Sequence, residues 1–276
     1  MVKRLVVNEG GHSTEDRPGS ARDVTVRTLQ GCRAIMHMAT DLKQRDRALD
    51  LLKWLALLSM LLDHLRYVGF SADWLYVPGR LAFPWFCLAM AANLAREPVT
   101  ANGQWRYLGW LVLFSAVSEI PYRLFLPNPD TLNVMPTLVL GLLVARGWRD
   151  RSLDARLLAV SAVVLAALFS GRLMFGFFGV LLPLATLLVI RRPWYFALLP
   201  GLVCLASNQW QVLYYSVRLG NHVAMAAVTT CLIAPWLGLF LLRHAQGVKP
   251  PAMRRWAYAL YPVHFLMLFA VRQAIA

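Results

Sequence analysis

A lysine and a histidine stand eleven positions apart in the first apolar stretch of the sequence, at Lys53 and His64. Eleven residues make about three turns of an α-helix, so both side chains point to one side, roughly 16 Å apart along the axis. A cation at a membrane surface can hold a phosphorylated cofactor, and a neutral imidazole deeper in the bilayer can act as a general base. The alternative is structural, with Lys53 reaching to the lipid surface and His64 a satisfied core residue.

Two acidic residues are expected near the depth of His64. Asp63 precedes it, but adjacent helix positions diverge by about 100°, so Asp63 can pair with a basic group on another span. Glu119 and Arg123 are four residues apart and can pair along one helix face. Glu119 is therefore expected to orient His64, to neutralise Arg123, or to do both, and a purely structural ion pair is the alternative.

Other polar residues also interrupt apolar runs, where ionisable groups are expensive and mark candidate sites. Arg80 stands at the edge of the second run, where it can bind an acceptor carboxylate or a lipid phosphate, or simply anchor the helix. Asn133 opens the fourth run, and His264 follows a proline within the last one. Together with Arg123, these residues are the candidates for substrate binding, and a packing role is the alternative for His264.

The composition places these residues in a membrane protein. The chain of 276 residues is 58% hydrophobic and only 15% charged, well below the roughly 25% charge of soluble domains. The net charge of +14 comes from basic clusters between apolar runs, a pattern that sets membrane topology and argues against nucleic-acid binding. The four cysteines have no CxxC spacing, so no metal site is expected.

The apolar runs predict an all-α bundle of about nine membrane spans, within a range of eight to ten. A span needs about 20 mostly apolar residues, and three of the runs are shorter. The predicted spans are 51–70, 80–96, 106–126, 131–146, 156–171, 173–190, 194–215, 223–243 and 256–275.

Basic residues in the loops test this count, because Lys and Arg favour cytoplasmic loops. One alternate set of loops carries 12 Lys and Arg, and the intervening set carries only Arg80, Arg172 and Arg218. This asymmetry predicts nine spans with a cytoplasmic N-terminus. The polar residues 1–47 lack an apolar signal-peptide core and predict a disordered cytoplasmic extension ahead of a membrane domain over 48–276.

Several separated motifs resemble the TraX family, which includes the F-pilin acetylation protein and a related conjugal transfer protein. The resemblance spans about residues 49–272. The motifs are LKWLALLSMLLDH at 52–64, GRLAFP at 79–84, SEIPYR at 118–123, NVMPTLVLG at 133–141 and YPVH at 261–264. The family is in turn similar to membrane-bound acyltransferases, whose signature is a basic residue, ten intervening residues and a histidine. Lys53 to His64 matches that spacing, with lysine where arginine is common.

The resemblance implies transfer of acetyl from acetyl-CoA to the N-terminal amine of a pilin subunit, at the outer face of the bacterial inner membrane. His64 would then be the base, with Asp63 and Glu119 beside it. Lys53 and the loop residue Arg146 would bind the CoA phosphates. Membrane lipids are the other expected partners. Open alternatives are acetylation of a sugar or lipid, a non-catalytic pilus-assembly factor, and a proton-coupled transporter.

Overall fold

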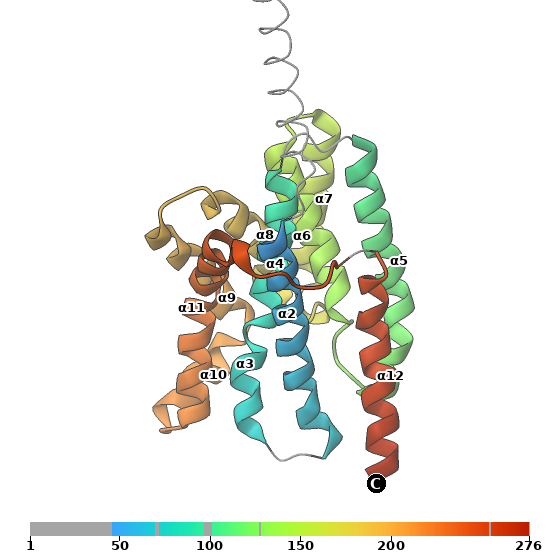
Figure 1. Ribbon diagram of the computed structural model, residues 1–276, viewed down its shortest axis with the longest axis vertical. Helices are drawn as coiled ribbons and strands as arrows, with labels where there is room; N and C mark the ends of the chain where they lie inside the picture. Colours follow the sequence, from blue (N-terminus) through green and yellow to red (C-terminus); the bar gives the residue numbers. More distant parts are fainter. Residues whose placement is uncertain (1–45, 70–71, 97–100, 127, 254, 276) are drawn as a thin grey trace, which may run out of the picture. The chain divides into compact units, whose positions relative to one another are not determined.

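A computed structural model describes residues 46–69, 72–96, 101–126, 128–253 and 255–275, and all regular elements in these ranges are helices (Figure 1). The prediction of an extension over residues 1–47 falls almost wholly outside them. Its last residues belong to the first described helix, α2 (Arg47–Leu65), because the Asp46 carboxylate accepts a hydrogen bond from the Leu49 backbone N–H at 2.9 Å. Such an N-cap satisfies one of the free amides of the first turn.

Each predicted apolar run corresponds to one helix or to two consecutive helices. After α2 come α3 (Tyr76–Gly79) with α4 (Ala82–Ala95), α5 (Ala101–Phe125), α6 (Val134–Arg149), α7 (Leu153–Leu168), α8 (Gly176–Val189), α9 (Leu198–Ser207) with α10 (Trp210–Arg218), α11 (His222–His244) and α12 (Ala257–Ile275). Short 3₁₀ turns are η1 (Arg66–Val68), η2 (Asp73–Leu75), η3 (Ser170–Arg172), η4 (Trp194–Ala197) and η5 (Ala245–Gly247).

Four helical stretches of the described chain are long and apolar enough to cross a membrane: Asp73–Ala95, Trp105–Phe125, His222–His244 and Ala257–Ile275. The bent pair α9 and α10 makes a fifth if it counts as one span. The nine predicted spans are thus only partly matched by length and composition. α6, α7 and α8 are short, and α2 carries several charged residues.

The seventh run was predicted as a single span. In the structure it is a broken helix rather than a continuous one. α9 and α10 meet at 87°, and Gln209 has a left-handed backbone with φ of 51°. Asn208 lies in the break and is buried; its side-chain amide donates to the Cys204 carbonyl at 2.7 Å. Non-helical backbone at membrane depth is tolerated where protein groups satisfy it, and Asn208 does so here.

The helices that carry the candidate site pack around α2. α2 lies against α4 and α11, and α12 packs along α5. In Figure 1, the segment that joins α11 to α12 crosses α2, where the Trp54 indole N–H donates to the Pro251 carbonyl at 3.0 Å. This crossing carries α12 to the side of α2 that faces α5, so that the last helix contributes to the same core as the first.

Candidate active site

His64 and His264 lie together although 200 residues separate them. His64 Nδ1 is 2.9 Å from His264 Nε2, and the two ring planes are nearly parallel, 14° apart, with centroids 5.0 Å apart. His264 is buried and His64 is half-buried. The structure therefore pairs the candidate base of α2 with the second imidazole, on α12.

The hydrogen bonds determine which nitrogen of His64 is basic. His264 Nδ1 lies 3.3 Å from the Leu260 carbonyl oxygen, which can only accept, so Nδ1 carries the hydrogen. In neutral His264 the Nε2 atom is then an acceptor, and His64 Nδ1 must donate to it. This chain leaves the lone pair of His64 on Nε2, the nitrogen that points away from His264.

Aromatic rings pack against the histidine pair. The Phe265 ring centroid lies 4.0 Å from that of His264 and 5.0 Å from that of His64. Phe125 approaches His64 edge-on, with 6.2 Å between centroids. Phe125 and Phe265 are fully buried. A low-dielectric wall of this kind favours the neutral form of an imidazole that is to act as a base.

A cavity of about 380 Å³ lies along the same face of α2. Lys53 and Leu57 line it from α2, and Leu57 is seven residues, or about two turns, before His64. Tyr261 lines it from α12, and its ring centroid is 5.4 Å from that of His264. Tyr261 therefore joins the cavity to the histidine pair.

The cavity has cationic groups from two elements and apolar walls. Lys53 and Arg255 both line it. Lys53 is near Asp50, with 3.8 Å between Nζ and a carboxylate oxygen. The remaining lining is mostly aliphatic and aromatic: Leu57, Phe86, Ala89, Met90, Asn93, Tyr107, Leu111, Val134, Met135, Leu138, Met253, Ala257, Tyr258 and Tyr261. A mostly apolar pocket with a few placed polar groups is typical of cofactor sites.

Arg146 lies on the face of α6 that also reaches the cavity, but it does not line it. It is eleven residues, about three turns, after the lining residue Met135. Its guanidinium lies 4.2 Å from the ring centroid of Trp105, and only 7% of the residue is exposed. Its Nε and Nη1 atoms have no hydrogen-bond partner in the structure as described, so Arg146 can accept an anion.

Asp63 was expected beside His64 as a catalytic residue, but its carboxylate pairs instead with basic groups, one of them on another span, the alternative that its place on the helix left open. Its carboxylate lies 2.9 Å from Arg66 Nη2 and 3.0 Å from Arg80 Nη2. Arg80 also donates to the Asn208 side-chain oxygen in the broken span, and its guanidinium lies 4.0 Å from the Tyr76 ring centroid. This network places Asp63 and Arg80 in a structural junction, separate from the histidine pair.

A model of the TraX protein family matches residues 48–272. The chain belongs to the TraX family. A search of curated proteins and a search of solved structures found no match to the chain. The match covers the histidine pair, the cavity and the Asp63 junction, so the family assignment applies to the whole described site.

Glu119 of this TraX family member makes no hydrogen bond with His64 among the described contacts, although the similar depth of the two residues in the membrane led us to expect one. Its hydrogen bonds within the described chain go to Arg123 Nε at 2.7 Å, to the Asn133 side-chain amide at 2.7 Å and to the Asn133 backbone N–H at 3.1 Å. The physical reason is that Asn133 begins α6, where free amides attract a carboxylate. Glu119 thus neutralises Arg123, which is the second of the two roles expected for Glu119.

Asn133 is a helix cap in this TraX family member. Its side-chain oxygen accepts from the Met135 backbone N–H at 2.9 Å, and its amide donates to Ser115 and Glu119. Since the residue is fully buried, the structure does not offer it to a substrate. Among the residues matched by the TraX model, Tyr261, Tyr107, Tyr258 and Arg255 line the cavity and were not singled out from the sequence. The YPVH motif was the only signal for Tyr261.

Proposed function

We propose that this protein is a membrane-bound acetyltransferase that moves acetyl from cytoplasmic acetyl-CoA to an amine at the outer face of the inner membrane. The observation that carries the proposal is the hydrogen-bonded pair His64–His264 beside a cavity with cationic side chains. A base with one available nitrogen near a mostly apolar cavity suits acyl transfer from a thioester.

The topology that goes with this function has nine crossings and a cytoplasmic N-terminus. In Figure 1, α2 and α12 run in one direction along the bundle and α4 and α11 in the other, as alternating crossings require. Arg96, Arg149 and Arg243 lie at one end of the bundle, and Arg96 bonds Asp46 at the start of α2. This end corresponds to the basic loops, which supports a cytoplasmic location for it.

The phosphates of acetyl-CoA would be held at this end. Lys53 and Arg255 line the cavity, and two guanidinium nitrogens of Arg146, on the face of α6 that leads to it, have no hydrogen-bond partner among the described residues. Phosphate groups bind such cations with charge-assisted hydrogen bonds. The pantetheine arm would then follow the apolar wall toward Tyr261, and the thioester would lie near His64.

The reaction would use His64 Nε2 as the general base. The acceptor amine attacks the thioester carbonyl carbon, the new C–N bond forms, and the amine proton passes to His64 Nε2. The C–S bond then breaks, and the protonated His64 returns the proton to the CoA thiolate. His264 would stabilise the imidazolium of His64 through the hydrogen bond that it accepts from Nδ1, the role of the third group in a nucleophile–base arrangement.

The acceptor that we propose is the N-terminal amine of a conjugative or type IV pilin, which signal-peptide removal exposes at the outer face. Family membership favours a role in conjugation and pilus formation, but a fold of this kind can serve other acceptors. A sugar or a lipid amine or hydroxyl is the alternative substrate for the same His64 chemistry.

The decisive test replaces His64 by Gln and measures acetylation of pilin from [¹⁴C]acetyl-CoA, together with the N-terminal mass of the pilin. We expect a loss of about 10²- to 10⁴-fold, the usual contribution of a general base. His222→Gln is the matched control, because His222 is an exposed histidine at the start of α11, and it should keep full activity. Full activity of the His64 variant would contradict the proposed role of His64 as the general base.

Binding of acetyl-CoA separates the enzyme from the other candidate classes. Isothermal titration of the purified protein should show binding that Lys53→Gln and Arg146→Gln weaken, since each removes one phosphate contact. A protein that binds no acetyl-CoA would instead be an assembly factor or a proton-coupled transporter. Binding with an unchanged pilin mass would point to the sugar or lipid acceptor.

A further inference from the structure

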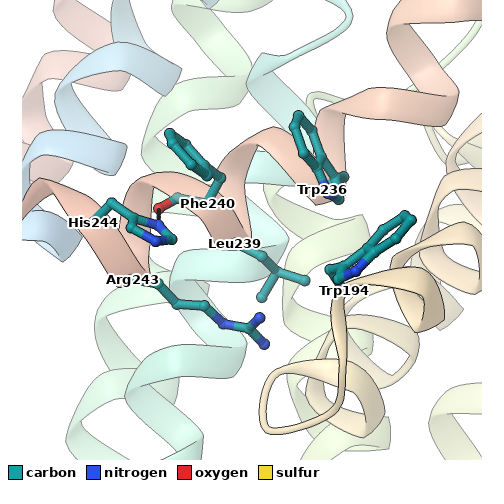
Figure 2. A pocket seen from close by; sticks show the side chains of 6 residues that line it. All are labelled: Trp194, Trp236, Leu239, Phe240, Arg243 and His244. Carbon is teal, nitrogen blue, oxygen red and sulfur yellow. Dashed lines mark hydrogen bonds between the residues drawn. The ribbon is translucent and has the colours of Figure 1, made fainter.

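A second pocket, of about 280 Å³, opens where α11 ends beside η4, and it takes no part in the proposed reaction. Figure 2 shows the six side chains that line it: Trp194, Trp236, Leu239, Phe240, Arg243 and His244. Trp194 comes from η4, and the other five lie on the last two and a half turns of α11. The pocket thus joins the broken seventh span to the end of the eighth.

The walls of this pocket are aromatic and open to the surroundings of the bundle. Trp236, Phe240 and His244 recur every four residues on α11, and their rings form a continuous stack with centroids 6.0 Å and 4.4 Å apart. Trp194 faces them across the pocket and is 64% exposed. Trp at the end of a membrane helix is typical of the interface, where the ring lies at headgroup level.

The polar part of the pocket is cationic. Arg243 Nη2 donates to the Arg192 carbonyl at 2.7 Å and approaches the Ile190 carbonyl at 3.5 Å, so the guanidinium is held in place at the end of α8. No described contact uses its Nε or Nη1, and the lining includes no carboxylate. His244 Nδ1 is 3.0 Å from the Phe240 carbonyl oxygen, which can only accept, so this bond uses the Nδ1 hydrogen of His244.

We propose that this pocket binds the phosphate headgroup of an anionic phospholipid of the cytoplasmic leaflet. Arg243 would donate to the phosphate, and the acyl chains would lie along the exposed Ile233, Trp236 and Phe240 of α11. Basic pockets between helices on the cytoplasmic side are where anionic headgroups bind. The location follows from the cytoplasmic N-terminus proposed above.

A lipid fits the pocket better than a soluble phosphate. Four of the six lining residues are Trp, Leu or Phe, and three of these are exposed, at 64% for Trp194, 42% for Trp236 and 47% for Phe240. A free phosphate gains nothing from such walls, whereas a lipid buries them under its glycerol and acyl chains. A bound headgroup would also hold η4 against α11 and so support the broken span.

The test measures lipid binding to the purified full-length protein by native mass spectrometry, with phosphatidylglycerol and phosphatidylcholine titrated separately. We expect tighter binding of phosphatidylglycerol, and a loss of about fivefold in Arg243→Gln, as one basic group near a membrane contributes about 1 kcal/mol. Arg218→Gln is the matched control, because Arg218 is an exposed arginine at the end of α10, and it should bind as the wild type does.

Arg243 also caps backbone carbonyls, so two further variants separate the two roles. Arg243→Lys keeps the charge and should keep most of the preference for phosphatidylglycerol, while Trp194→Leu should weaken binding of both lipids. Equal binding of the two lipids, or an equal loss in Arg218→Gln, would overturn the proposal. Displacement of the lipid by low millimolar inorganic phosphate would identify a free-phosphate site and would also overturn it.

Discussion

Asp63 and His64 are neighbours in the sequence but belong to two regions of the bundle that are built differently. Asp63 is held by Arg66 and Arg80 in a junction with α3 and the broken span. His64 makes its described polar contact with His264, and the nearby cavity leaves space for a ligand. One side of α2 is therefore closed by ion pairs, while the other carries the histidine pair and, about two turns earlier, the residues Lys53 and Leu57 that line the cavity.

This difference separates polar groups that stabilise the fold from those available for chemistry. A buried charge is stable only if partners replace its water, and Asp63 has such partners on both sides. Among the described residues, by contrast, no hydrogen bond uses His64 Nε2, and an available nitrogen is what a base requires. We expect substitutions on the Asp63 side to change stability and substitutions on the His64 side to change activity.

The largest loss of stability is expected for Asp63→Ala. It leaves Arg66 and Arg80 without their shared carboxylate. Removing one partner of a fully buried ion pair typically costs about 3–5 kcal/mol, and since the Asp63 side chain is 16% exposed we expect a loss at the lower end, about 3 kcal/mol. Equilibrium unfolding in mixed detergent micelles measures the loss. Asp73→Ala is the control, since Asp73 is exposed in η2 and should be close to neutral. Wild-type stability of Asp63→Ala would contradict a structural role for the junction.

Gly79→Ala should destabilise the same junction by overpacking. A Cβ at Gly79 would lie 2.5 Å from the Cβ of Asp63, which forces α2 and α3 apart, and such insertions cost about 1–3 kcal/mol. Gly109→Ala in α5 is the matched control, because an added Cβ there meets nothing within 4 Å. The thermal unfolding midpoint should fall for Gly79→Ala alone. A fall of equal size in both would show that the contact with Asp63 is not the cause.

On the other side of α2, His264→Ala should lower acetyl transfer without unfolding the protein. The hydrogen bond to an imidazolium is worth about 1.5–3 kcal/mol, which corresponds to about ten- to hundredfold in kcat. His264→Gln retains an oxygen that can accept from His64 Nδ1 and should recover part of the rate. If Ala and Gln have equal rates, the hydrogen bond does not position His64.

The smallest effect is expected for Glu119→Gln. The amide keeps one acceptor for Asn133 but loses the ion pair with Arg123, whose side chain is 50% exposed, so the cost should be about 1 kcal/mol or less. Unfolding and acetyl transfer are measured on the same preparation. A loss of rate as large as that of His264→Ala would mean that Glu119 acts on His64 after all.

The helices and the identity of the polar candidates followed from local sequence. Each of the nine apolar runs became one helix or two consecutive helices, because apolar length is a property of neighbouring residues. The divergence of Asp63 from His64 followed from the 100° step of the helix. The family assignment also came from motifs that can be recognised in the chain alone and was confirmed by the family model over residues 48–272.

The partners of these residues were decided by the packing of helices that are distant in sequence. His64 meets His264 because α12 returns beside α2, and Glu119 meets Asn133 because α6 begins next to α5. The break at Asn208 and the tyrosines of the cavity likewise had no periodic signal. Local periodicity determines which side of a helix a residue occupies, but only the tertiary structure decides which helix faces that side.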